Sequence, residues 1–219
     1  MKIQSKYKFI IWDWNGTIFD DTSFCVGIMN NLLSKRALPL LTIENYKEIF
    51  DFPVKNYYQK LGFDFDNEPF EKIGSEFINK YNKNHFSCKL HVDIEKLINK
   101  LDENDYAQFV LSAREETKLI EDLKHYGIRT LFQDVSGLNN HYANGKISIG
   151  KSLIQRNGIN PENCILIGDT LHDAEVAAEL KVDCLLIANG HHSYKKLKQI
   201  NVPVFKSVTE LGDYLFCGS

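Results

Sequence analysis

No long hydrophobic run occurs in this sequence. The first apolar segment, residues 9–12, ends directly at Asp13, so it is shorter than the roughly 7–15 apolar residues at the core of a secretory signal. No later segment reaches the ~20 consecutive apolar residues that a helix needs to cross a bilayer. We therefore expect neither a secretory leader nor a membrane-spanning helix.

Cysteine pairs and an excess of positive charge are also missing. The net charge is -3, so the chain has no basic field for nucleic acid or anionic lipid. A small molecule is therefore the expected partner, and the oligomeric state stays open. The cysteines are odd in number, scattered, and without a C-x-x-C pair: Cys25, Cys88, Cys164, Cys184 and Cys217. Their spacing disfavours disulfides and a zinc site, and it predicts reduced, mostly buried thiols in a cytoplasmic protein.

The 219 residues alternate between short apolar runs and helical patterns. The predicted helix at residues 115–126 has Leu119 and Leu123 on one face and Gly127 as a stop signal, and two more helices are predicted at 150–155 and 172–180. The apolar runs are typical of strands that are covered on both faces. This order predicts an α/β fold with a doubly wound parallel sheet. Its strands are expected at residues 8–12, 107–111, 164–167, 184–188 and 202–205.

Residues 22 to about 85 interrupt the alternation. Phe24, Ile28 and Leu32 fall at helical spacing, and further helical patterns follow at 43–50, 54–61 and 70–81. We therefore predict a small α-helical cap domain, residues 20–87, inserted after the first strand of an α/β core domain formed by residues 1–19 and 88–219. The aromatic residues Tyr57, Tyr58, Phe63 and Phe65 are expected to form a small core in this insertion rather than a substrate cage.

Polar residues follow several of the predicted strands, where ligands of open α/β sheets bind. They are DWNGT at residues 13–17, Ser112-Ala113-Arg114, and GDTLHD at residues 168–173, with Lys146 before the helix that leads to the last of these strands. The four segments together resemble the motifs of the haloacid dehalogenase (HAD) superfamily. A helical insertion directly after the first motif is similar to the cap of its phosphoglycolate phosphatase-like branch. The resemblance implies Mg²⁺ and a small phosphorylated substrate.

Each motif residue has an expected role. A carboxylate can approach an anionic phosphoryl group only where positive charge is supplied, as Mg²⁺ and a lysine would do. Asp13 is the predicted nucleophile, and Mg²⁺ is expected at Asp13, Asp169 and, by family resemblance, the backbone carbonyl of Asn15. The remaining predictions are Ser112, Ala113, Lys146 and the amides near Gly16 around the phosphoryl group, Thr17 as a loop-fixing hydroxyl, and Asp173 behind Asp169.

Simpler readings exist for single residues. Asp13 could be a turn former, Asp169 a helix cap, and Ser112 the cap of the next helix; the co-occurrence of the motifs favours the functional roles. Lys151 could be mistaken for Lys146, but the distance to the Asn160-Pro161 turn favours Lys146. Three histidines stay undecided as site residues, with an outward orientation favoured for the first: His172, His191 and His192.

Asn15 departs from the resemblance. Phosphatases of this branch usually have a second aspartate there, which protonates the leaving group, and an amide cannot carry that proton. Three explanations stay open: a leaving group that needs no proton, a substitute acid from the cap or His172, or a protein that binds phosphate and turns it over poorly. We expect Asn15→Asp to raise Mg²⁺-dependent turnover of alkyl phosphates and to change turnover of aryl or acyl phosphates very little.

Two other functions are compatible with Asn15. One is phosphonate hydrolysis, in which a cap lysine forms an imine with an aldehyde substrate; Lys35, Lys47, Lys55 and Lys60 are candidates, and none is singled out. The other is non-catalytic binding of a phosphorylated ligand. The retained Asp13, Lys146 and Asp169 favour an enzyme over this last function.

Overall fold

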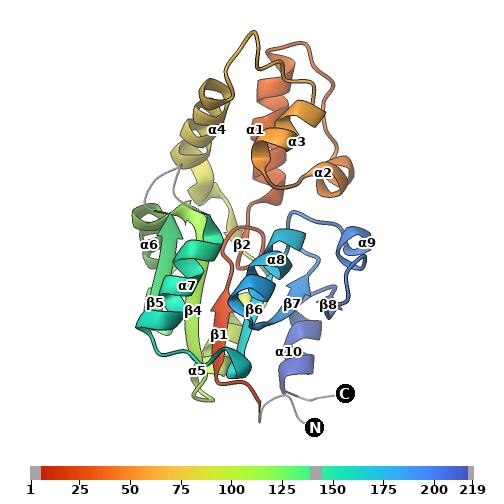
Figure 1. Ribbon diagram of the computed structural model, residues 1–219. Helices are drawn as coiled ribbons and strands as arrows, with labels where there is room; N and C mark the ends of the chain where they lie inside the picture. Colours follow the sequence, from red (N-terminus) through yellow and green to blue (C-terminus); the bar gives the residue numbers. More distant parts are fainter. Residues whose placement is uncertain (1–5, 139–144, 217–219) are drawn as a thin grey trace.

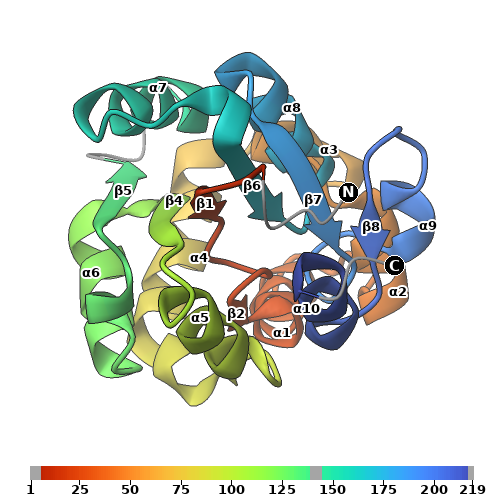
Figure 2. The same cartoon turned by 90° about the horizontal axis from the view of Figure 1, so that it is seen from below.

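The computed structural model describes residues 6–138 and 145–216. Six parallel strands form one sheet in the order β5-β4-β1-β6-β7-β8. Helices cover both faces of the sheet (Figures 1 and 2), so the predicted doubly wound α/β fold is confirmed. The strands are β1 (Phe9–Trp12), β4 (Ala107–Glu115), β5 (Asp134–Leu138), β6 (Cys164–Gly168), β7 (Asp183–Ile187) and β8 (Val204–Phe205).

Alternation along the strands separates two apolar cores. In β1, Ile10 and Trp12 face one core while Ile11 faces the other, because successive side chains of a strand point to opposite faces. The first core includes apolar residues of α5 (Ile94–Asp102), α6 (Glu116–His125) and α10 (Val208–Phe216). The second includes residues of α7 (Lys146–Arg156), α8 (Leu171–Leu180) and α9 (Tyr194–Leu197). Short 3-10 turns lie at His85–Ser87, Arg129–Leu131 and Pro161–Asn163.

Four helices form a separate group above the carboxyl ends of the strands (Figure 1). They are α1 (Thr22–Ser34), α2 (Ile43–Ile49), α3 (Val54–Lys60) and α4 (Phe70–Asn84). Their apolar faces share a third core. Tyr57, Tyr58 and Phe63 lie in this core and Phe65 packs against it, as predicted. The domain limits given from the sequence stay a prediction; we use the term cap for α1 to α4.

The chain passes between the cap and the sheet at two segments that pair with each other. Strand β2 (Phe19–Asp20) is antiparallel to β3 (Lys89–Leu90), so the entry and exit of the cap are hydrogen-bonded together. The His91 amide N–H then donates to the Ile18 carbonyl at 3.0 Å. Neither strand was predicted, because two-residue strands leave no periodic pattern in the sequence.

Two element boundaries near the predicted site differ from expectation. Strand β4 continues to Glu115, so Ser112 lies inside a strand rather than after it. Helix α7 begins at Lys146 rather than at residue 150, because Ile147 and Ile149 pack against the second core and extend its apolar face toward the N-terminus. Strand β5 was not predicted, since its sequence DVSGL has only two large apolar residues.

Candidate active site

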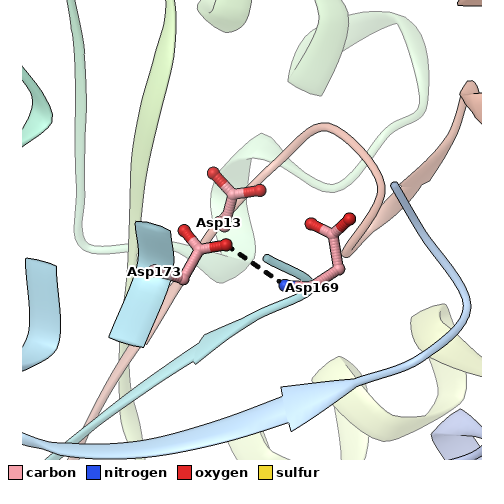
Figure 3. A group of neighbouring side chains, drawn as sticks. All are labelled: Asp13, Asp169 and Asp173. Carbon is pink, nitrogen blue, oxygen red and sulfur yellow. Dashed lines mark hydrogen bonds between the residues drawn. The ribbon is translucent and has the colours of Figure 1, made fainter. Parts of the chain in front are cut away.

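Three buried aspartates meet at the carboxyl ends of two neighbouring strands (Figure 3). Asp13 follows β1, Asp169 follows β6, and Asp173 lies in the first turn of α8. Ligand atoms of all three lie within 4.8 Å of one another. The adjacent parallel strands β1 and β6 bring the first two together, and the Asp13 amide donates to the Ile167 carbonyl at 2.9 Å.

Both carboxylate oxygens of Asp173 are engaged by other groups of the protein. Its Oδ2 accepts hydrogen bonds from the Thr170 hydroxyl at 2.6 Å and from the amides of Asp169 and Thr170. The Thr170 side chain caps the helix in return, so the pair forms a capping box. Its Oδ1 contacts Lys146 at 2.6 Å, so Asp173 holds the lysine, whereas its predicted role of orienting Asp169 or waters stays a prediction.

Lys146 lies between two of the carboxylates. Its side chain is buried, and its Nζ pairs with Asp13 as well as with Asp173. Lys151, the other candidate for this position, lies on the surface and pairs with Glu179 at 3.6 Å. The geometry therefore places Lys146, and not Lys151, in the aspartate cluster.

Asp169 fits a narrow cradle made by two glycines. Its Oδ1 accepts from the Thr17 hydroxyl at 2.9 Å and its Oδ2 from the His191 amide. A Cβ on Gly16 would lie 2.3 Å from Asp169 Oδ2, and a Cβ on Gly190 would lie 2.0 Å from it. Gly16 also has φ +76°, which favours glycine. Thr17 and Gly16 thus fix Asp169 rather than only their own loop.

Burial makes the negative charges of this cluster unfavourable. It raises the pKa of Asp13 to about 7, although Lys146 acts in the opposite direction. It likewise raises the pKa of Asp169 to about 6. For Asp173 burial is outweighed by the charge and hydrogen bond of Lys146 together with the hydrogen bonds from Thr170, so its pKa is lowered. Lys146 thus compensates the charge of Asp173, whereas ionised Asp13 and Asp169 together give the cluster a surplus of negative charge.

This surplus suits a divalent cation. Carboxylate oxygens are the donors that Mg²⁺ prefers, and ligand oxygens of Asp13 and Asp169 lie within 4.8 Å of each other. A bound cation would lower both pKa values, because opposite charge favours the ionised form. The donor set therefore fits the predicted Mg²⁺, which would be held by Asp13 and Asp169.

Mg²⁺ is expected to stabilise this protein at pH 7.5 and to have little effect near pH 4.5. Without metal, the raised pKa values of Asp13 and Asp169 contribute stability below their ordinary pKa near 3.8, and it is lost as pH rises through about 6 and 7. Bound Mg²⁺ would offset this loss of stability, because it favours the ionised carboxylates. Melting curves with Mg²⁺ or EDTA at both pH values measure the effect, and an equal shift at both would contradict it.

The Asn15 side chain forms hydrogen bonds with the entry of the cap and with a cap helix. Its Nδ2 lies 2.7 Å from Asp21 Oδ2 and 2.7 Å from the Tyr81 hydroxyl, which belongs to α4 of the cap. Asp21 itself is buried at the start of α1 and forms an ion pair with His191 at 3.2 Å. The sequence did not indicate Asp21 or Tyr81, because neither lies in a motif or at a strand end of the sheet.

Ser112 and Ala113 lie on the strand beside the nucleophile. Strand β4 pairs with β1, and Val110 is opposite Trp12, so both residues lie just beyond this level at the carboxyl end. Ser112 is buried, and its hydroxyl accepts from the Arg114 amide at 3.2 Å. Their predicted contacts with a phosphoryl group remain predictions.

The three undecided histidines have different surroundings. His191 borders the cluster; the Asp21 carboxylate outweighs the effect of burial and raises the His191 pKa to about 9. His192 is buried, accepts from the Leu171 amide at 3.1 Å, and has its pKa lowered to about 4 by burial. His172 contacts Glu175 at 3.0 Å and the ring of Phe52, away from the aspartates, as favoured from the sequence.

Comparison with known proteins identifies the family. The sequence profile of the haloacid dehalogenase-like hydrolases matches residues 10–187, which include all four predicted motifs. The chain belongs to this family. The predicted HAD-like hydrolase is thereby confirmed, and no match was found among the curated proteins.

Solved structures share the fold of this HAD-like hydrolase. A predicted phosphatase from Clostridium acetobutylicum superposes with a TM-score of 0.82 at 18% identity, covering 96% of this chain and 98% of the other. A haloacid dehalogenase-like protein from Streptococcus pneumoniae gives 0.81 at 18% identity, with 96% and 99% covered. A predicted phosphoglycolate phosphatase from Haemophilus somnus gives 0.75 at 16% identity, with 97% and 98% covered. At these identities the likeness shows the fold.

The structure of this HAD-like hydrolase adds cap and hinge residues to the site. Lys47 of α2 is half-buried and donates to the Asn189 carbonyl at 3.2 Å, and its charge interacts with Asp169. His91, in the loop after β3, donates from Nε2 to the Gly16 carbonyl at 2.9 Å. His91 was missed as a site residue, and Lys47 was named only as one of four cap lysines, because the position of both depends on how the cap sits over the sheet.

Two sequence expectations concern the whole chain. Over residues 6–138 and 145–216, no helix is both long and apolar enough to span a membrane. Within the same ranges Cys25, Cys164 and Cys184 are buried and Cys88 is partly buried, all as free thiols. Cys217 lies outside the described residues.

Proposed function

We propose that this protein is a Mg²⁺-dependent phosphatase that hydrolyses a small phosphorylated metabolite through an aspartyl-phosphate intermediate. The observation that carries the proposal is the buried cluster of Asp13, Asp169 and Lys146 at the carboxyl edge of the sheet. It provides a nucleophile, a cation site and a fixed positive charge within one small volume. Family membership supports hydrolysis, and the free cysteines of the described residues support a cytoplasmic setting.

The residues divide the reaction between them. An Asp13 oxygen attacks phosphorus, and the bond from phosphorus to the leaving oxygen breaks with its electron pair on that oxygen. Water then attacks phosphorus, and the Asp13 carboxylate leaves. Mg²⁺, when bound, would neutralise phosphoryl charge; Lys146, held in place by Asp173, supplies a second positive charge for it. Ser112 and the amide of Ala113 complete the expected phosphoryl contacts; the Gly16 amide, also expected there from the sequence, donates instead to the Phe19 carbonyl at 2.8 Å and to Asp21 Oδ1 at 3.1 Å.

Asn15 limits the substrates that suit this site. Its amide cannot give a proton to the leaving oxygen, and general acid help is typically worth about 10²- to 10⁴-fold in rate. The leaving group of an acyl or aryl phosphate is a stable anion, so its departure needs less general acid catalysis than that of an alkyl phosphate. We therefore propose that the preferred substrate has a leaving group that departs without a proton.

Release of inorganic phosphate tests the proposal. The purified protein is assayed against sugar, nucleotide, acyl, aryl and phosphonate compounds, each with Mg²⁺ or with EDTA. We expect turnover that requires Mg²⁺ and is fastest for acyl or aryl phosphates. If no compound is hydrolysed, the chain would instead bind a phosphorylated ligand without catalysis.

Phosphonate hydrolysis is a second candidate, and the contacts of Lys47 support it as the cap lysine that would form the imine. Lys47 faces Asp169, and burial lowers its pKa, which favours the neutral amine that forms an imine. By contrast, Lys35 pairs with Glu76 and Lys55 lies over the Phe65 ring. In the assay with phosphonoacetaldehyde, borohydride is therefore added to trap any imine. Trapped substrate that is lost in Lys47→Arg but kept in Lys55→Arg would favour this candidate, and no trapping would remove it.

A further inference from the structure

Three polar atoms from three parts of the chain lie in mutual contact. Asn15 Nδ2 lies 2.7 Å from Asp21 Oδ2 and 2.7 Å from the Tyr81 hydroxyl, and that hydroxyl donates to the same Asp21 oxygen at 2.7 Å. Asn15 belongs to the loop after β1, Asp21 caps α1 at the entry of the cap, and Tyr81 lies near the end of α4. Asp21 is only 1% exposed and Tyr81 5%, so water does not replace these contacts.

The second oxygen of Asp21 continues the network toward the other side of the cap. Oδ1 accepts from the Gly16 amide at 3.1 Å and pairs with His191 Nε2 at 3.2 Å. The other ring nitrogen of His191 lies 2.9 Å from the Tyr46 hydroxyl of α2. Asp21 thus joins the nucleophile loop to two cap helices, α4 through Tyr81 and α2 through His191.

The chemistry of this network requires an amide at position 15. An ionised carboxylate only accepts hydrogen bonds, so the Asn15 atom that faces Asp21 must be a donor. An aspartate at position 15 would place two carboxylates in contact in a buried site, where like charges repel strongly. Asn15 therefore cannot transfer a proton to the leaving group, but its amide can donate a hydrogen bond to Asp21.

We propose that Asn15 is a positioning residue: with Asp21 and Tyr81 it forms a clasp that holds the cap closed over the nucleophile loop. The clasp fixes Gly16, and Gly16 in turn borders Asp169. Opening the clasp would therefore loosen both the cap and the loop that presents Asp13. The consequence for turnover rests on the proposed phosphatase function, whereas the closure of the cap does not.

A charge swap tests the clasp. Asn15→Asp brings two carboxylates together and Asp21→Asn removes the charge that pairs with His191, so each single variant should loosen residues 14–21. In the double variant Asn15→Asp/Asp21→Asn, the new amide donates to the new carboxylate, and its oxygen still accepts from the Gly16 amide. We expect hydrogen exchange of residues 14–21 to rise about tenfold or more in each single variant and to fall below both single variants in the double variant, which restores a donor and an acceptor between positions 15 and 21 but not the charge that pairs with His191.

Tyr81→Phe provides a milder test with a matched control. It removes one hydroxyl of the clasp and keeps the ring, so exchange at residues 14–21 should rise about tenfold while exchange in β4 to β7 stays unchanged. Tyr57→Phe also removes a buried cap hydroxyl, but that hydroxyl has no hydrogen-bond partner among the described residues. This control should leave exchange at residues 14–21 unchanged.

The outcomes separate the clasp from the proposed function. Rescue of exchange in the double variant, together with rescue of kcat/KM for the best substrate, supports the positioning role. Unchanged exchange at residues 14–21 in Tyr81→Phe, or a double variant that exchanges as fast as the faster single variant, would overturn it. The two outcomes that would overturn the clasp are measured by hydrogen exchange alone, so they test it even if no compound is hydrolysed.

Discussion

Asp13→Asn is expected to reduce Mg²⁺-dependent phosphate release by more than about 10⁴-fold, the scale seen when a catalytic nucleophile is removed. An amide of the same shape cannot attack phosphorus, and it replaces the carboxylate that contacts Lys146 and borders the proposed cation site. The fold should persist, since burial already raises the Asp13 pKa to about 7 and a neutral side chain avoids that unfavourable charge.

Asp20→Asn is the matched control for this variant. Asp20 lies in the same segment, but its side chain is 53% exposed and contacts only His91 at 3.9 Å among its ion-pair partners in the described chain. We expect activity close to wild type. Acid quenching with radiolabelled substrate should show labelled protein for wild type and none for Asp13→Asn. Activity of Asp13→Asn within tenfold of wild type would show that another group attacks phosphorus.

Lys146→Met is expected to reduce phosphate release by about 10²- to 10³-fold, as for the loss of one group that stabilises transition-state charge. It also leaves the buried carboxylates of Asp13 and Asp173 without their shared cation. Breaking a buried ion pair by removing one partner typically costs about 3–5 kcal/mol, so urea unfolding without Mg²⁺ should shift to lower denaturant concentration.

Lys151→Met makes the same change five residues along α7. The side chains of Lys151 and Glu179 are each 59% exposed, and exposed ion pairs contribute at most about 1 kcal/mol. We therefore expect normal turnover and nearly normal stability. Equal losses in the two variants would mean that the effect comes from α7 as a whole and not from the contact with Asp13.

The structure also changes what is expected of Asn15→Asp. From the sequence alone, an acid at position 15 should speed turnover of alkyl phosphates. With Asp21 Oδ2 at 2.7 Å from the amide nitrogen, the single variant introduces repulsion as well as an acid. A gain on alkyl phosphates is therefore expected in the double variant Asn15→Asp/Asp21→Asn.

The sequence alone was sufficient for five of the six described strands of the sheet, for the order of the motifs, and for the expectation that Asp13, Lys146 and Asp169 lie together. These depend on local patterns: apolar strands that are buried on both faces, and polar residues placed where parallel strands end on one edge. The sequence was not sufficient for β5, whose five residues include Ser136 and Gly137 and carry little apolar signal.

Only the tertiary structure decided what Asn15 contacts and which cap residues reach the site. Tyr81 is 66 positions from Asn15, and His191 is 145 positions from Tyr46. Such contacts depend on how the cap is oriented by the paired segments β2 and β3, and their short, non-periodic sequences do not reveal that pairing. Spacing along a chain identifies the ends of strands, whereas the contacts between two packed bodies arise only when both have folded.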